Sequence, residues 1–346
     1  MLRFVVRRIL LLVPVLFGLS ILLFIWLRAL PGDPARALLG EKATPSSIAK
    51  INQTYGFDKP LVQQYFVYVG RLIKGDFGNS PRTGEPVLGT FLDRFPATVE
   101  LALAALIFAI VVGIPLGYFA AKRAGGILDM ITVSGSLLGV VIPVFVLAYL
   151  LKVVFAVGLP GSIFGWKLAH LAVLPTSGRQ SVTLDATHYT NLYVLDGLIT
   201  REWDSAWDAV LHLVLPGMAL GSIPLAIIVR MTRASVIDVL NEDYVRTARS
   251  KGLSRALITR RHVLRNAMLP VTTTIGLQTG ALLAGAVLTE SVFAFNGIGS
   301  YLFDAISNLD FAVLQGFIIF IALVYALVNL VVDVLYGVID PRLRTR

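Results

Sequence analysis

The stretch ATVELALAALIFAIVVGIPLGYFAA, residues Ala97–Ala121, contains a single charged side chain, that of Glu100. A helix needs about 20 apolar residues to cross the hydrocarbon core of a bilayer, so this stretch predicts a membrane span. Apolar runs of similar length recur on both sides of it. Together they predict six spans, which are Ile9–Leu27, Ala97–Ala121, Ile131–Leu151, Leu211–Val229, Met268–Thr289 and Val313–Val332.

The composition of the 346 residues agrees with an all-α membrane protein. Hydrophobic residues make up 56% of the chain and charged residues only 15%, whereas soluble domains carry about 25% charged residues. The basic N-terminus resembles the start of a signal peptide, but its apolar region is too long and lacks a cleavage site. We therefore expect it to be retained as the first span, in residues 1–30. The absence of cysteine excludes disulfides and thiolate metal sites.

The basic residues predict the orientation of the spans. Short loops rich in Lys and Arg stay in the cytoplasm, and such residues precede span 1, follow spans 2 and 6, and fill the segment from Arg230 to Arg265. Both termini are therefore expected in the cytoplasm. Residues 31–96 and 158–209 are expected outside as small folded caps, with an interfacial or re-entrant piece at Ile163–Pro175. The net charge of +9 then reflects topology and anionic lipids rather than nucleic acid binding.

The most polar segment is NEDYVRTARSKGLSRALITRRHVLRNAMLP, from Asn241 to Pro270. Asn241 is a favourable N-cap, acids follow it, and Gly252 is a favourable stop, so Glu242–Lys251 is predicted to be a short helix. At about 15 Å it is half a bilayer long, and it is too charged to enter one. Ser254 is expected to cap a second basic helix, which leads into the fifth span.

One face of the predicted short helix combines a bulky ring with small residues. At about 100° per residue this face holds Tyr244, Thr247, Ala248 and Lys251. Such a knob would fit a groove on another protein. A solvated loop whose arginines meet lipid phosphates is the alternative, and the residues alone leave both interpretations open.

The same segment resembles a known family. The pattern Arg246-Thr247-Ala248-x-x-x-Gly252, followed by Leu269-Pro270, is similar to the cytoplasmic EAA loop of permease subunits in ATP-binding-cassette importers. Arg246 stands where the general pattern has glutamate, and the spacer before Leu269 is longer than usual. Both departures resemble the dipeptide, oligopeptide and nickel branch.

The resemblance extends over nearly the whole chain, and it is strongest to the first of the two permease types of a dipeptide importer. The segments that carry it occur in one order: RRILLLVPVLFGLS, RALPGDPARALLG, YGFDKPLVQQYFVY, KGDFGNS, FPATVELALAAL, GIPLGYFAAKRAG, RMTRASVIDVL, LTESVFAFNGIG and DVLYGVIDPRLR. Only residues 158–209 look longer and more individual. The resemblance makes residues 97–346 the permease core, with an outer loop at 158–209 and the EAA-type loop at 241–270.

The resemblance implies that this chain forms half of a translocation pathway in a bacterial cytoplasmic membrane. Dipeptides or short oligopeptides are the expected cargo, with nickel or haem-like chelates as the alternative. The expected partners are a second homologous permease, two ATPase subunits and an extracytoplasmic binding protein. The short helix would be the coupling helix that contacts an ATPase, through Asp243, Tyr244, Arg246, Thr247, Ala248, Arg249 and Gly252.

The chain contains no GxxxxGK[ST] phosphate loop, so ATP and Mg are expected on the ATPase subunits and no cofactor on this chain. Its four histidines are scattered and form no HExxH motif, and there is no GxSxG elbow. We therefore predict no catalytic residue and no metal site. An ion-coupled carrier would place ionisable residues at mid-membrane, whereas Glu100, Glu290 and Asp333 lie near the ends of the predicted spans.

Two spans carry small or helix-breaking residues. In the fifth span, Gly280, Ala281, Ala284 and Gly285 allow neighbouring helices to approach closely. This serves packing within the subunit or, as the resemblance implies, lines the pathway at the interface with the partner permease. In the fourth span, prolines and glycines between Pro216 and Pro224 would either ease rocking or fit a kinked neighbour.

Overall fold

The computed structural model describes residues 2–29, 34–40, 43–80, 82–157, 162–163, 166–167, 174–184 and 186–339. The regular structure of these residues is helical, as expected, apart from the two-residue strands β1 (Ser162–Ile163) and β2 (Trp166–Lys167), which pair antiparallel. Its contacts group into two compact units, Met1–Pro96 with Asn296–Arg346, and Ala97–Phe295.

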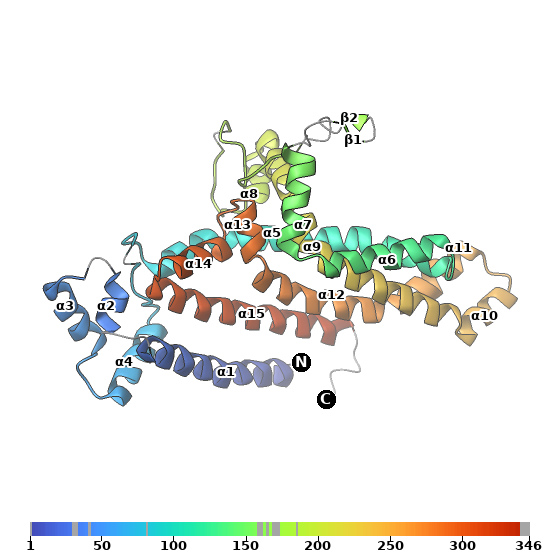
Figure 1. Cartoon of the computed structure of the whole chain (residues 1–346). Coiled ribbons are helices and arrows are strands. Elements are labelled where there is room, and N and C mark those ends of the chain that lie inside the picture. The colour runs from blue at the N-terminus through green and yellow to red at the C-terminus, as the bar shows by residue number, and fades with distance from the viewer. Residues whose placement is uncertain are drawn as a thin grey trace. The chain divides into compact units, whose positions relative to one another are not determined.

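The first unit packs α1 against α15, and Figure 1 shows the two helices lying side by side. Its core is formed by Val87, Phe91, Ile298, Val313 and Phe317, together with neighbouring apolar side chains. The described residues of segment 31–96 contain three short helices and the first turns of α5. The elements of this unit are α1 (Leu2–Ala29), α2 (Pro34–Leu39), α3 (Pro45–Tyr55), α4 (Leu61–Ile73), the start of α5 (Val87–Lys122), α14 (Ile298–Ser307) and α15 (Phe311–Ile339).

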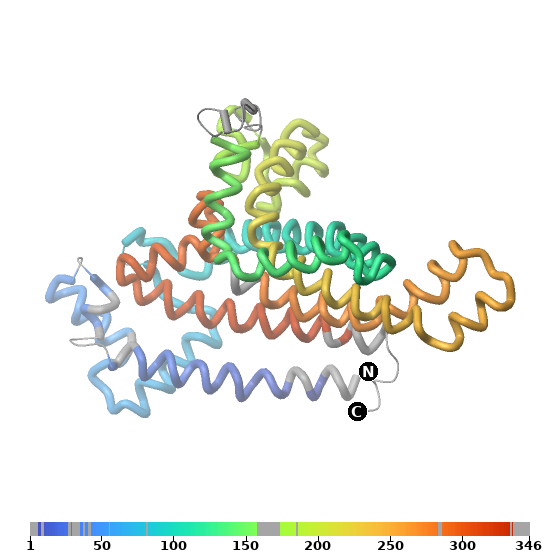
Figure 2. The backbone as a smooth tube through the Cα atoms, turned by 45° about the vertical axis from the view of Figure 1, so that its right-hand side comes forward, coloured from blue at the N-terminus to red at the C-terminus, as the bar shows by residue number. Residues whose placement is uncertain are grey.

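The second unit is built around α9, which packs against α6, α7, α8 and α12. Figure 2 shows α9 running into the α10 loop, from which the chain returns as α12. Besides the rest of α5, the unit contains α6 (Ile127–Val141), α7 (Val144–Lys152), the π-helical turn η2 (Val153–Val157), α8 (Tyr193–Thr200), α9 (Trp203–Leu240), α10 (Asp243–Ser250), α11 (Arg255–Leu257), the π-helical turn η4 (Ile258–Leu264), α12 (Arg265–Gly285) and α13 (Val287–Val292).

Glycines allow α5 and α9 to pack at backbone distance. A Cβ atom built on Gly221 of α9 would lie 2.6 Å from the Ala105 carbonyl oxygen, and one on Gly117 of α5 would lie 2.6 Å from the Val229 carbonyl oxygen. Real Cβ atoms do not approach an oxygen so closely, because the two atoms would overlap and repel each other. The close-packed interior leaves no space into which either helix could shift. Helix α9 is continuous from Trp203 to Leu240, although it contains Pro216 and Pro224. Gly221 of the fourth span therefore serves close packing in this structure.

The predicted third span, Ile131–Leu151, is not one straight helix. The chain breaks between α6 and α7, and the helix axes on the two sides of the break differ by 104°. The cause is Pro143, because a residue that precedes proline is driven out of the helical region. Ile142 accordingly has φ −74° and ψ 123°.

Three described helices are long and apolar enough to cross a membrane, namely Val87–Lys122, Trp203–Leu240 and Phe311–Val332, and the bent α6–α7 pair makes up to four. The remaining predicted spans, Ile9–Leu27 and Met268–Thr289, fall on α1 and on α12 with α13. Helix α5 begins at Val87, before the predicted start of its span. Most of Ile163–Pro175 and the C-terminal residues 340–346 lie outside the described residues.

The glycine contacts yield a paired stability prediction. Gly221→Ala should destabilise the protein by about 1–3 kcal/mol, because the new methyl group overlaps a backbone carbonyl of α5. Gly217→Ala, one turn earlier in α9, is the matched control, since its Cβ would meet the Ala104 Cβ at an ordinary 3.4 Å. The midpoints of thermal unfolding in detergent should show a loss only for Gly221→Ala. Equal midpoints for the two variants would contradict the close packing.

Candidate functional site

The polar segment folds into a short helix followed by a sharp stop. Helix α10 spans Asp243–Ser250, and Glu242 precedes it in an extended conformation without a capping side-chain bond. Asn241, the predicted N-cap, instead ends α9. Gly252 has φ +72°, the left-handed conformation that helix stops favour. Ser254 caps α11 as expected, because its hydroxyl oxygen accepts a bond from the Leu257 N–H.

An apolar cluster fixes α10 to the rest of the second unit. Val245 and Ala248 point inward from α10 and join side chains from α5, α9, η4 and α12. These are Ala121, Val236, Ile258, Val263 and Ala267. Val245 is fully buried, and Ala248 is only 5% exposed. A helix of eight residues is marginal by itself in water, so this cluster gives α10 its stability and its orientation.

Ala248 points inward and does not lie on the exposed docking face that the sequence predicts. The sequence predicts that Ala248 shares a docking face with Tyr244, Thr247 and Lys251, but the Ala248 methyl group packs inside this chain. Tyr244 is partly exposed, and its hydroxyl accepts a 3.0 Å hydrogen bond from the Asn266 side-chain amide at the start of α12. Tyr244 therefore links α10 to α12 in addition to any surface role.

The outward face of α10 is polar and charged. Asp243, Arg246, Thr247, Arg249 and Ser250 are all exposed. Asp243 and Arg246 approach to 3.5 Å, but such surface pairs contribute about 1 kcal/mol at most. The Thr247 hydroxyl donates to the Asp243 carbonyl at 2.9 Å. This face can therefore meet a partner without unfolding α10.

Two partly exposed leucines follow α10 in the chain. Leu253 and Leu257 follow the Gly252 stop and are about 40% exposed. The loop from Asp243 to Leu257 therefore exposes both charged and apolar side chains. Interfaces between proteins commonly combine these two properties.

The small residues of α12 are only partly described. Gly280 is buried and Ala281 is exposed, whereas the surroundings of Ala284 and Gly285 lie outside the described residues. Several threonines also make α12 polar. The hydroxyls of Thr272, Thr274 and Thr279 each donate to the carbonyl four residues earlier, at 2.6–3.0 Å. Such bonds satisfy a hydroxyl within its own helix, which permits threonine in an apolar environment.

The buried acids of the second unit have defined partners. Glu100 forms a 2.8 Å ion pair with Arg179, and both side chains are 9% exposed. Glu100 also accepts a bond from the Val194 N–H, and Arg179 lies 3.7 Å above the Tyr193 ring. The fully buried Glu290 accepts a 2.6 Å bond from the Thr98 hydroxyl. Glu100 therefore holds the loop before α8 against α5.

The sequence did not predict these pairings. Glu100 lies well inside α5 rather than at its start, because the helix begins ahead of the predicted span. Its partner Arg179 lies in the segment before α8, which has no recognisable sequence pattern. A lone acid in an apolar run was the only available signal. The side chain of Asp333, the third acid considered, lies outside the described residues.

An apolar groove of about 690 Å³ lies between α5, α8 and α9. Its lining includes Leu103, Ile107, Leu198 and Val214, and Glu100 is the charged residue among the lining side chains. Because Glu100 is already paired with Arg179, the groove offers no matching group for the charged ends of a peptide. Within the described part of the chain, no three His, Cys, Asp or Glu side chains gather to hold a metal ion.

Comparison with known proteins identifies the family. The model of the "binding-protein-dependent transport system inner membrane component" matches residues 113–345, and the model of the N-terminal part of such membrane components matches residues 1–102. This chain belongs to that family of transport permeases. Family members are membrane subunits of ATP-binding-cassette importers, in which other subunits hydrolyse ATP. The resemblance seen in the sequence is therefore confirmed.

Relatives of this permease match over almost their entire length. The di/tripeptide transport system permease protein DppB of Pseudomonas aeruginosa is 46% identical over 345 residues, covering 99% of both chains. The dipeptide transport system permease protein DppB of Alkalihalophilus pseudofirmus is 42% identical over 344 residues, covering 99% of this chain and 100% of the relative. The glutathione transport system permease protein GsiC of Escherichia coli is 37% identical, covering 99% of both chains.

The buried ion pair of this permease can be tested by a double-mutant cycle. Arg179→Met and Glu100→Gln should each cost about 3–5 kcal/mol, because each leaves one buried charge without its partner. The double variant should cost less than the two single costs together, since it leaves neither charge behind. Denaturant unfolding of the purified variants measures all three changes. Strictly additive costs would show that the two residues are not coupled.

Proposed function

We propose that this chain is the first permease subunit of an importer for dipeptides or short oligopeptides and forms half of its translocation pathway. Full-length identity of 42–46% to permeases named for dipeptide or di/tripeptide transport carries this proposal. Nickel or haem-like chelates remain the alternative cargo on the same architecture. An ion-coupled carrier is disfavoured, because Glu100 and Glu290 are held by buried structural partners.

The proposed topology has six spans and cytoplasmic termini. The spans are α1, α5, the bent α6–α7 pair, α9, α12 and α15. The threonine hydroxyls of α12 donate hydrogen bonds to carbonyls of the same helix. Because these polar groups are satisfied within the helix, α12 can enter the bilayer although it is less apolar than the other proposed spans. The basic residues that flank these helices support the orientation, since cytoplasmic loops are rich in Lys and Arg.

Helix α10 is proposed as the coupling helix between α9 and α12. Its exposed face, with Asp243, Arg246, Thr247 and Arg249, would contact an ATPase subunit. Val245 and Ala248 would transmit the contact to α5, α9 and α12 through their shared cluster. ATP binding can shift the permease between two conformations only if the contacts with the ATPase differ between them. Because its apolar cluster holds α10 in place, a changed contact on the exposed face would reach the surrounding helices.

The complete importer would contain this chain, a second homologous permease, two ATPases and an extracytoplasmic binding protein, in a bacterial cytoplasmic membrane. ATP and Mg would bind the ATPases. Residues 1–30 would form the first span, 31–96 the outer segment and 97–346 the remaining spans, with the outer loop at 158–209. The exposed Ala281 of α12, with Gly280, Ala284 and Gly285, would border the pathway at the interface with the second permease.

Uptake assays test the substrate. A strain that lacks this chain should lose uptake of a labelled dipeptide and regain it when the gene is restored, because half of the pathway is missing without it. Uptake of labelled glutathione and of a nickel chelate should be unaffected and serves as the control. A deletion that abolishes nickel uptake and spares dipeptide uptake would assign the alternative cargo.

A charge on the exposed face tests the coupling role of α10. Thr247→Asp would place a carboxylate in the proposed ATPase contact, where an unpaired buried charge costs several kcal/mol. We expect loss of most co-purified ATPase and of substrate-stimulated ATP hydrolysis. Ala248→Asp would be less informative, because the Ala248 methyl group packs in this chain's own cluster.

Thr54→Asp is the matched control for this experiment. Thr54 is also an exposed helical threonine, and its hydroxyl donates to the carbonyl four residues earlier at 2.8 Å, as that of Thr247 does. It lies on α3, in the segment proposed to face outward, so ATPase binding should persist. If Thr247→Asp retained its ATPases as fully as Thr54→Asp, α10 would not be the coupling helix.

A further inference from the structure

Helix α4 presents a continuous apolar stripe to its surroundings. At about 100° per residue, Val62, Phe66, Val69 and Ile73 fall within one narrow sector of the helix. Val62 and Phe66 are each 68% exposed and Ile73 is 81% exposed. Removing side chains of this size from water is favourable, so a stripe left in water would be costly.

The opposite side and the ends of α4 are held in place. The buried Gln64 side chain donates hydrogen bonds to the carbonyls of Phe57, at 3.0 Å, and Lys59, at 2.7 Å. Arg71 forms a 2.8 Å ion pair with Asp76 just beyond the helix, and this bond lowers the pKa of the Asp76 carboxyl. The stripe is therefore displayed by a fixed helix rather than by a frayed end.

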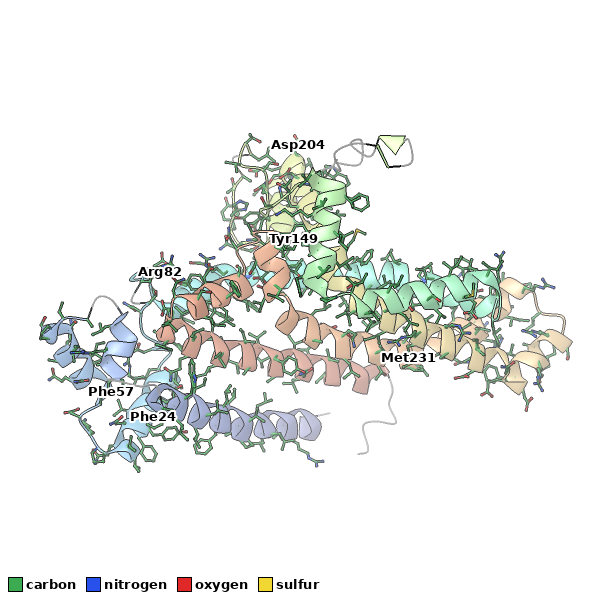
Figure 3. All side chains as sticks on the ribbon, in the orientation of Figure 1. Phe24, Phe57, Arg82, Tyr149, Asp204 and Met231 are labelled. Carbon is green, nitrogen blue, oxygen red and sulfur yellow. The ribbon has the colours of Figure 1, made fainter. Side chains whose placement is uncertain are left out.

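Contacts with α1 give the depth of α4 relative to the proposed spans. Tyr65 packs edge-on against Phe17 and Phe24, with ring centroids 6.1 and 5.2 Å away, and shares a 2.9 Å hydrogen bond with Ser20. Figure 3 labels Phe24 on α1 beside α4. Helix α1 continues to Ala29, so at 1.5 Å per residue Ser20 lies about 13 Å before its outer end.

Helix α15 provides a second depth marker. The apolar stretch of α15 that can span a membrane begins at Phe311, and the Phe311 ring contacts Trp26 of α1 at 5.8 Å. Trp26 is thus level with the start of that stretch. Tyr65 contacts α1 at Phe17, Ser20 and Phe24, on the inner side of Trp26. The middle of α4 therefore lies deeper than the point where the α15 span begins.

The stripe of α4 continues the apolar surface of α1. Leu10, Val13 and Phe17 lie along one side of α1 and are all more than half exposed. Phe17 is exposed and also contacts Tyr65 of α4, and the Tyr65 ring lies 6.1 Å from that of Phe66 in the stripe. At the two ends of α4, Lys59 and Lys74 are exposed, in position for their ammonium groups to reach lipid phosphates.

The geometry points to a phospholipid-binding surface on α4: the helix lies within the outer leaflet, with the Val62–Ile73 stripe among acyl chains. This inference rests on the proposed membrane placement of α1 and α15. Within the outer segment 31–96, α4 would then be embedded in lipid rather than forming part of a cap surrounded by water. It would also hold α3, which packs against it, at a fixed height above the membrane.

Site-specific fluorescence tests the lipid contact in the assembled importer. The chain has no cysteine, so single cysteines can carry an NBD probe when the partner subunits are also cysteine-free. Phe66→Cys and Ile73→Cys report on the stripe, Leu10→Cys on α1 is the lipid-facing control, and Ser46→Cys on α3 is the exposed polar control. Nanodiscs containing nitroxide-labelled phospholipid quench probes in lipid, and iodide quenches probes in water.

We expect lipid quenching at positions 66 and 73 to match position 10 and to exceed position 46 by about threefold, with the opposite order for iodide. Iodide quenching at 66 and 73 equal to that at 46 would overturn the inference. Shielding from both quenchers, or shielding that appears only when the binding protein is added, would assign the stripe to a protein partner and overturn it too. Failure of lipid quenching at position 10 would instead refute the proposed span α1.

Discussion

Helices α5 and α9 touch backbone to backbone, and the second unit depends on this contact. Neither Gly117 nor Gly221 leaves room for a Cβ atom, because a carbonyl oxygen of the opposite helix already occupies that position. In a bilayer the hydrophobic effect cannot drive helices together, so close van der Waals packing must do so. With α5 fixed on one side, α9 still packs against α6, α7, α8 and α12. The two prolines inside α9 are tolerated because the surrounding helices hold it in place.

The α10 loop depends on the same scaffold. Its apolar cluster takes Ala121 from the end of α5, Val236 from α9 and Ala267 from α12. The bond between Tyr244 and Asn266 adds a polar link to α12. A force on the exposed face of α10 is thus shared among three helices, because none of the buried atoms can move without displacing its neighbours. This arrangement suits a helix that is to transmit the state of another subunit.

Local signals in the sequence predicted local structure well. The short helix, its glycine stop and the Ser254 cap all occur where they were predicted, since each depends on a few adjacent residues. The direction of Ala248 could not be predicted in this way, because an exposed helix of eight residues has no long apolar stripe to show which face is inward. The apolar run Ile131–Leu151 predicts a span and says nothing of its bend, which depends on the effect of Pro143 on the preceding residue. The pair between Glu100 and Arg179 joins distant segments, and no local pattern encodes it.

The bend at Pro143 also explains how a lysine is accommodated at the end of an apolar helix. Helix α7 turns away from α6 and packs against α13, whose last residue is Val292. The final carbonyls of a helix have no partner within that helix, and the Lys152 ammonium donates to the Val292 carbonyl at 2.9 Å. Lys152 also lies 5.8 Å above the Phe293 ring, where the ring face attracts a cation. A straight third span would direct α7 along the axis of α6 and away from this contact. The cation at the end of α7 and the open end of α13 therefore satisfy each other only because the span is bent.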